Sequence, residues 1–250
     1  MKMQEHVEKK DFEGKSLFIA TPCYGGMVHS NYVISLFRTM RLLDSFNIPI
    51  EFFFLQNDSL ISRARNLCTT NFIASGKSHM IFIDADQQWD ENDVLKFLYC
   101  DKDVLVGPVP KKQLPISYNC AIYKNEDGSL KKETIVEDRF VEVAYGGTGF
   151  MMIKKDVFEK MFEAYPNLSY ELHPSLELTP ECLEENKHLK HYALFDTSVE
   201  KHANGKLMYF GEDYMFCKRY VDIGGKILLD PNVKINHIGN YTFVGDVSKL

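Results

Sequence analysis

Two acidic residues separated by one alanine follow directly on a short apolar run. In "MIFIDAD" (80–86), four apolar residues lead into Asp84, Ala85 and Asp86. Carboxylates at this spacing can hold Mg²⁺ or Mn²⁺ and leave coordination positions open for phosphate oxygens. The alternative is a strand-to-helix turn, because Asp is also common in turns and at helix starts.

A second acidic pair precedes a helical pattern near the end of the chain. Glu212 and Asp213 in "GEDYMFCKRY" stand at the predicted helix start, where the helix dipole favours an ionised carboxylate. An unprotonated carboxylate suits a catalytic base, although a helix-capping Asp has the same signature. His237 follows a short predicted strand, and a lone histidine is more often packed or exposed than a metal ligand.

The sequence lacks the glycine-rich loops that commonly bind phosphates. "TPCYGGM" (21–27) follows the first predicted strand without forming GxGxxG, and no GxxxxGK[ST] motif occurs. This disfavours dinucleotide-dependent dehydrogenases and P-loop enzymes. The predicted helix around "SRARN" carries Arg63, Arg65 and Asn66, and such a helix could present an arginine to a nucleobase or phosphate. The alternative is a solvated helix face.

Strands and helices alternate in the first half of the chain. Apolar runs without alternation indicate strands buried on both faces of a parallel sheet, and they cover 17–21, 50–57, 80–86 and 103–109. Helical patterns between them cover 29–46, 59–75 with Ser59 as N-cap, and 90–100 opening with Asp90. This order predicts an α/β fold, in which ligands bind beyond the carboxyl ends of the strands.

The second half predicts more antiparallel structure. Residues 116–136 indicate a hairpin with Asp127-Gly128 as its turn. "VEVAYGGTGFMMIKK" (141–155) indicates a strand, a glycine-rich turn and a second strand, followed by a helix from Asp156. The polar segment 166–208 is long for a connection inside a compact domain. We expect it to form a mobile lid over the site next to Asp213.

Composition excludes several classes of protein. A chain of 250 residues that is 45% apolar can bury a sizeable core, and its net charge of −6 disfavours nucleic acid as a partner. The six scattered cysteines indicate buried thiols in a reducing compartment. No stretch has the apolar length of a signal peptide or a membrane helix. We therefore expect a soluble protein of the cytoplasm, or of the host cytoplasm if the chain is viral.

The motifs, taken in order, resemble the GT-A glycosyltransferases. They look most like the family 2-type enzymes and related small viral and bacterial glycosyltransferases with a DxD motif. The resemblance extends over about residues 16–245. Five segments carry it: "SLISRARN" (59–66), "IFIDAD" (81–86), "GGTGFMMIKKDVF" (146–158), "GEDYMFCKRYVDIGGKILLDP" (211–231) and "NHIG" (236–239).

The resemblance implies a GT-A fold with a mainly parallel central sheet, flanking helices and a small antiparallel portion on the acceptor side. Since no repeat or linker is visible, we expect one domain over 1–250, with 16–110 as the nucleotide-sugar-binding half and 111–250 as the acceptor and catalytic half. The implied activity is metal-dependent transfer of a hexosyl or deoxyhexosyl group from a nucleotide-diphosphate sugar to an acceptor hydroxyl of a glycan or glycoconjugate. UDP-sugars are favoured over GDP-sugars, and Mn²⁺ over Mg²⁺.

The resemblance also implies roles for the matching residues. Thr21 and Pro22 would line the nucleoside pocket, Arg63 would contact the base, and Asn66 would hold the neighbouring loop. Asp213 would be the catalytic base, with Glu212 beside it. The donor-binding set is Thr21, Pro22, Arg63, Asn66, Asp84, Ala85 and Asp86. The metal ligands would be Asp84, Asp86 and His237, and Gly147, Thr148 and Gly149 would border the sugar and acceptor.

Two other classes stay open. A sugar nucleotidyltransferase also combines an α/β sheet with metal-binding acids, but it commonly has a glycine-rich, basic N-terminal loop that "TPCYGGM" lacks. A catalytically inactive relative that binds carbohydrate or nucleotide sugar is disfavoured, because the residues that would bind metal and remove a proton are all present.

Overall fold

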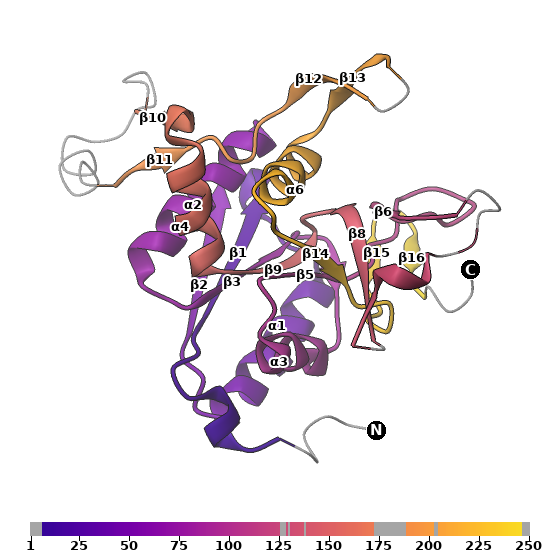
Figure 1. Ribbon diagram of the computed structural model, residues 1–250. Helices are drawn as coiled ribbons and strands as arrows, with labels where there is room; N and C mark the ends of the chain where they lie inside the picture. Colours follow the sequence, from indigo (N-terminus) through magenta and orange to yellow (C-terminus); the bar gives the residue numbers. More distant parts are fainter. Residues whose placement is uncertain are drawn as a thin grey trace.

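The computed structural model describes residues 7–125, 129, 131–137, 139–172, 189–202 and 205–246. Within this part, a central sheet is covered by helices on both faces (Figure 1). Its strand order is β2 (Ile50–Gln56), β1 (Leu17–Cys23), β3 (His79–Ile83), β9 (Phe150–Lys154), β5 (Val104–Val106), β14 (Ile227–Leu229), β8 (Phe140–Gly146), β6 (Cys120–Ile122), and β7 (Ile135–Val136) also pairs with β8.

The helices form two layers. One face of the sheet packs against α1 (Ser30–Ser45) and α3 (Glu91–Cys100). The other packs against α2 (Ile61–Ser75), α4 (Lys155–Ala164) and α6 (Glu212–Asp222). Short 3₁₀ turns are η2 (Lys9–Phe12), η3 (Tyr24–Gly26), η4 (Lys132–Thr134) and η5 (Pro166–Leu168). None of the described helices has the length and apolar composition needed to cross a bilayer.

Side chains of the central strands alternate between the two layers, because successive residues of a strand point to opposite faces. In β1, Leu17 and Ile19 belong to the core under α1 and α3, whereas Phe18 and Ala20 belong to the core under α2, α4 and α6. All of β3 is buried, which confirms the strand predicted from its unbroken apolar run. The carboxyl end of this strand leads directly to Asp84.

Most strands of the sheet run in the same direction, as predicted, but its antiparallel part is more central than expected. β1 pairs in parallel with β2 and β3, and β14 pairs in parallel with β5. The antiparallel β9, however, lies between β3 and β5. Its apolar residues Phe150 to Ile153 are all buried, and a central position covers both of their faces. Strands from 16–110 and 111–250 consequently share one sheet.

Two local expectations were wrong. β2 is not buried on both faces, because it is the last strand in the order and, among the described residues, has a strand neighbour on one side only. Ser59 does not cap α2, whose N-cap is Leu60 with no side-chain capping bond. Instead, the Asp58 carboxylate accepts the Leu60 N–H at 2.9 Å and also holds Arg63, so Asp58 organises the start of this helix.

The other helix predictions are confirmed to within a residue or two. Asp90 caps α3 by accepting the Asn92 N–H, and α6 begins at Glu212. The predicted hairpin turn at Asp127-Gly128 lies outside the described residues. So do 173–188 and 203–204 of the expected lid. The described parts of that segment include β10 (Ser169–Tyr170) paired with β11 (His191–Tyr192), and the hairpin of β12 (Ser198–Lys201) and β13 (Leu207–Phe210).

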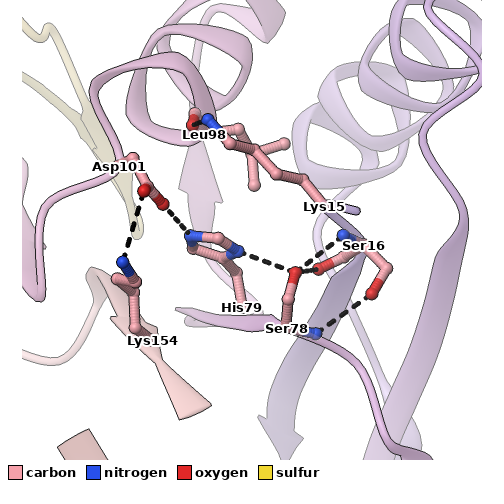
Figure 2. Close-up of polar contacts among 7 residues, drawn as sticks. All are labelled: Lys15, Ser16, Ser78, His79, Leu98, Asp101 and Lys154. Carbon is pink, nitrogen blue, oxygen red and sulfur yellow. Dashed lines mark hydrogen bonds and ion pairs between the residues drawn. The ribbon is translucent and has the colours of Figure 1, made fainter. Parts of the chain in front are cut away.

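A polar network joins β1 and β3 at their amino ends (Figure 2). Ser16 and Ser78 each donate a backbone N–H to the other's hydroxyl, at 2.7 and 3.0 Å. The buried His79 ring lies between the Ser78 hydroxyl at 2.9 Å and the Asp101 carboxylate at 3.0 Å. Burial lowers the pKa of His79. The network fixes the register of the two strands from the end opposite to Asp84.

Candidate functional site

A small second sheet brings Asp86 and His237 together. Beyond β3, the Asp84 N–H donates to the Gly149 carbonyl at 3.2 Å, and the chain then turns into β4 (Gln87–Gln88). β4 pairs with β15 (Asn236–Ile238), which pairs in turn with β16 (Thr242–Val244). The Ile238 N–H donates to the Asp86 carbonyl at 2.8 Å. This pairing places the two side chains side by side.

The carboxylate of Asp86 has a cationic or imidazole partner at each oxygen. Lys112 Nζ lies 2.6 Å from Oδ2, and His237 Nε2 lies 3.3 Å from Oδ1. Burial raises the pKa of Asp86, but the hydrogen bonds and charges of His237 and Lys112 outweigh it and lower this pKa to about 2. Asp86 is therefore a carboxylate at neutral pH.

His237 is oriented as metal-binding histidines are. Its Nδ1 lies 2.8 Å from the Pro110 carbonyl, which can only accept, so Nδ1 carries a proton and Nε2 is the nitrogen left to bind a cation in place of a proton. Neighbouring ligands of one octahedral ion at about 2.1 Å are about 3 Å apart. The 3.3 Å between Nε2 and Asp86 Oδ1 is close to that separation. The pair fits a divalent cation.

The protein supplies few ligands at this point. Within the described part of the chain, no cluster of three or more His, Cys, Asp or Glu side chains could hold a metal ion. One oxygen of Asp84 is engaged, since its Oδ1 accepts a 2.7 Å hydrogen bond from Arg65 Nη2. Most coordination positions of a cation at Asp86 and His237 would therefore be left to a ligand and water.

Arg65 and Asp84 form an ion pair at the back of the site. Arg65 is 3% exposed and its guanidinium lies 4.9 Å from the centre of the Phe82 ring. Burial acts to lower its pKa, but the charge of Asp84 and the hydrogen bond to it outweigh this and raise the pKa. Nε and Nη1 have no partner among the described residues. Arg65 thus fixes the orientation of Asp84 and adds a permanent positive charge to the site.

Asp213 is held in the first turn of α6. Its Oδ1 accepts the Tyr214 N–H at 2.7 Å, and its Oδ2 accepts the Asn119 side-chain amide at 2.7 Å. Asn119 can reach Asp213 because residue 147 is glycine: a Cβ on Gly147 would lie 2.5 Å from Asn119 Nδ2. Burial and then the charge of Asp213 raise the pKa of the neighbouring Glu212.

Two adjoining cavities meet at these residues. Their volumes are about 670 Å³ and about 460 Å³, and both are lined by Arg65, Asp84, Glu212 and His237. The larger one is otherwise lined by Pro22, Tyr24, Met27, Val28, His29, Ile61, Ala85 and Asp86. The smaller one is otherwise lined by Val109, Pro110, Lys111, Lys112, Asn119, Gly147, Thr148, Gly149 and Asp213. We call them the outer cavity (670 Å³) and the inner cavity (460 Å³).

A third cavity of about 830 Å³ lies elsewhere, beside Asp103, Lys160 and Tyr220. None of the site residues lines it. The Asp103 carboxylate already accepts the Tyr220 hydroxyl at 2.7 Å and lies 3.6 Å from Lys160 Nζ. The size of this third cavity does not by itself indicate a function. The outer and inner cavities, although smaller, are therefore the candidate site.

Three residues predicted for the donor site do not line either cavity. Thr21 is buried with its hydroxyl 2.5 Å from that of Tyr32. Arg63 makes two hydrogen bonds to Asp58, at 2.8 and 2.9 Å. Asn66 exchanges two hydrogen bonds with the backbone of Phe195, at 3.0 and 2.9 Å, and so holds the neighbouring loop. Contacts of Thr21 and Arg63 with a nucleoside stay predictions.

Sequence reasoning missed Lys112, Asn119 and the outer-cavity residues Tyr24 and Met27. Lys112 and Asn119 stand in an irregular segment, where no periodicity marks which side chains face a site. Tyr24 and Met27 are 72% and 75% exposed beside Gly25 and Gly26, both at positive φ. Large apolar residues on a glycine turn after a predicted strand were the available signal.

The chain is similar to solved structures of other proteins, but it has no match at the level of sequence. No protein-family model matches the sequence, and no curated protein sequence is significantly similar to it. One similar solved structure is S. aureus TarS 1–349 in complex with UDP-GlcNAc, with a TM-score of 0.40 and 12% identity, covering 86% of this chain and 55% of that one. The chain thus spans about half the length of that structure. Another is a glycosyltransferase involved in the glycosylation of the major capsid of PBCV-1, with a TM-score of 0.31 and 9% identity, covering 69% of this chain and 75% of that one.

Proposed function

We propose that this chain is a glycosyltransferase that moves a sugar from a nucleoside-diphosphate sugar to an acceptor hydroxyl with the help of a divalent cation. The observation that carries the proposal is the Asp86–His237 pair at the junction of two cavities, with Asp213 on the wall of the inner one. A nucleotide sugar has two dissimilar ends joined by a diphosphate. Asp86 and His237, which could hold a cation between the outer and the inner cavity, match that arrangement.

The outer cavity suits the nucleoside. Pro22, Tyr24 and Met27 offer apolar and aromatic surface, against which a base and ribose can pack. Ala85 and Asp86 at the edge of the same cavity bring that end of the donor next to the cation-binding pair. UDP-sugars are the favoured donors, and GDP-sugars are the alternative.

Asp86 and His237 would hold the cation, and an imidazole beside a carboxylate favours Mn²⁺ over Mg²⁺. Bound there, the cation would offset negative charge that develops on the departing nucleoside diphosphate. Arg65 adds a permanent positive charge on the same side. Asp84 would contact the ribose or the cation through Oδ2, because Arg65 holds its Oδ1.

The inner cavity suits the sugar and the acceptor. Its wall carries no side chain at Gly147 and Gly149, and Asp213 also lines it. Asp213 would take the proton of the acceptor hydroxyl as the acceptor oxygen bonds to the anomeric carbon. The bond from that carbon to the diphosphate breaks as the new bond forms, and its electron pair leaves with the nucleotide. Asn119 and the Tyr214 N–H hold the carboxylate in place.

A panel of UDP- and GDP-sugars tests the proposal, with release of UDP or GDP measured in Mn²⁺, in Mg²⁺ and in EDTA. We expect release from at least one donor in Mn²⁺, none in EDTA, and near-complete loss in Asp86→Asn. The matched control is Asp156→Asn, an exposed carboxylate at the start of α4, which should keep wild-type activity.

Two outcomes would contradict the proposal. Release of pyrophosphate from a nucleoside triphosphate and a sugar 1-phosphate, without donor turnover, would indicate a sugar nucleotidyltransferase. Tight binding of nucleotide sugars in EDTA without turnover in any metal would indicate a binding protein.

A further inference from the structure

Lys112 contacts the same carboxylate that would hold the cation. Its ammonium lies 2.6 Å from Asp86 Oδ2, opposite the oxygen that faces His237. The segment around it is closed by a 2.7 Å hydrogen bond from the Lys111 N–H to the Ser117 carbonyl, and Pro110 in the same segment accepts from His237. One short loop therefore supplies both the orientation of His237 and the counter-ion of Asp86.

We propose that Lys112 competes with the divalent cation for Asp86 and releases it when a diphosphate binds, so that cation binding becomes conditional on the nucleotide. This inference rests on the proposed function. A cation that arrives without a nucleotide finds the Lys112 ammonium on one oxygen of Asp86, and the positive charge of Lys112 repels it. A diphosphate offers the ammonium another anionic partner, which frees Asp86 for the cation.

The side chain of Lys112 can make this exchange. It lines the inner cavity, and the side chains of Lys112 and Asp86 are 39% and 37% exposed, so the pair is neither buried nor locked by packing. A lysine carries its charge on a flexible four-carbon stem and can change partner without backbone movement. Because Asp86 stays ionised, the competition is between cations and does not involve a proton.

The exposure of the pair also limits the size of the effect. An exposed ion pair contributes little free energy. We therefore expect the Lys112–Asp86 pair to change the affinity for the cation about fivefold at most. Coupling between two ligands is reciprocal, so Lys112 should strengthen the effect of the nucleotide on the cation and of the cation on the nucleotide by the same factor.

The test measures Mn²⁺ affinity directly, from the electron paramagnetic resonance signal of free Mn²⁺, on the full chain with and without UDP or GDP. We expect Lys112→Gln to bind Mn²⁺ alone about fivefold more tightly than wild type. The gain in Mn²⁺ affinity on adding nucleotide should be smaller than in wild type. Thermal unfolding checks that the variant is folded.

Two controls separate competition from a general effect of charge. Lys111→Gln removes the neighbouring positive charge on the inner-cavity wall, and no ion pair involves Lys111 within the described residues. Lys226→Gln removes a lysine that pairs with Glu142 at 2.7 Å, away from both site cavities. Both should change Mn²⁺ affinity much less than Lys112→Gln.

The failures are distinguishable. Equal Mn²⁺ affinity in wild type and Lys112→Gln, or an equal gain in Lys111→Gln, would overturn the role of Lys112 and leave the proposed function standing. Absence of Mn²⁺ binding in every variant, with and without nucleotide, would overturn the cation site itself. Unchanged Mn²⁺ binding in Asp86→Ala would do the same.

Discussion

Replacing Gly147 with alanine tests how the candidate base is positioned. The new Cβ would lie 2.5 Å from Asn119 Nδ2 and 3.1 Å from its Cγ. Since side chains do not approach so closely, Asn119 must move, and its 2.7 Å hydrogen bond to Asp213 Oδ2 is lost. Gly147 is not among the positive-φ glycines, so the cost comes from the added Cβ and not from the backbone.

The expected magnitudes follow from these contacts. Inserting a methyl group into a filled space costs about 2 kcal/mol of unfolding free energy. A hydrogen bond to a charged group contributes about 1.5–3 kcal/mol, and Asp213 keeps its bond from Tyr214. We therefore expect a loss near the low end of this free-energy range. It corresponds to a fall in turnover of about 10- to 30-fold, with little change in nucleotide affinity.

A double-mutant cycle with Asn119→Ala provides the assay, read by urea unfolding and by nucleotide release. Asn119→Ala removes the same hydrogen bond and also the nearest atoms, so that only its Cβ remains, 3.2 Å from the new methyl group. The double variant should then be nearly as stable and active as Asn119→Ala alone. Additive losses would refute the reasoning. Gly239→Ala, whose Cβ would meet the Lys112 side chain at an ordinary 3.5 Å, is the matched control for the stability measurement.

Three further predictions concern the two carboxylates. Asp86→Ala should abolish cation-dependent nucleotide binding and His237→Ala should weaken it, measured by calorimetry with Mn²⁺; full activity of both in chelator would exclude a cation at this pair. Asp213→Asn should lower turnover at least about 100-fold at unchanged donor affinity, and a matching loss of donor binding would indicate a structural role. The pKa of Asp86, lowered from 3.8 to about 2, means that the ionised group stabilises the fold above about pH 4 and that this contribution is lost as the pH falls through 2. The difference in unfolding free energy between wild type and Asp86→Asn, about 1 kcal/mol after allowing for solvent exposure, should be present at pH 5 and shrink below pH 4.

Elements with local signals could be predicted from the sequence. The unbroken apolar run before Asp84 is a strand buried on both faces, and Asp90 and Glu212 mark helix starts. These signals depend on neighbouring residues only: burial on two faces removes alternation, and free N–H groups at a helix start attract acidic side chains. The α/β class and the place of Asp84 and Asp86 at a strand end follow from them.

The order of the strands could not be predicted in the same way. β9 was expected as a strand, but its place between β3 and β5 depends on pairing with segments far away in the chain. The exposed side chains of β2 likewise follow from its place at the sheet edge, although its sequence is as apolar as that of a central strand. Nearest-neighbour sequence patterns carry no information about which strand lies alongside.

The same limit applies to the candidate site. The sequence by itself determined which residue types could bind a cation or remove a proton, because carboxylates and imidazoles have that chemistry wherever they stand. Only the tertiary structure decided their partners: Arg65 faces Asp84, while Arg63 is held by Asp58. Asp86 meets His237 and Lys112 because β4 pairs with β15 and the loop after β5 closes over both. Each contact joins segments that lie far apart in the sequence. Pairing between strand backbones brings these segments together, and the types of the contacting residues do not reveal that pairing.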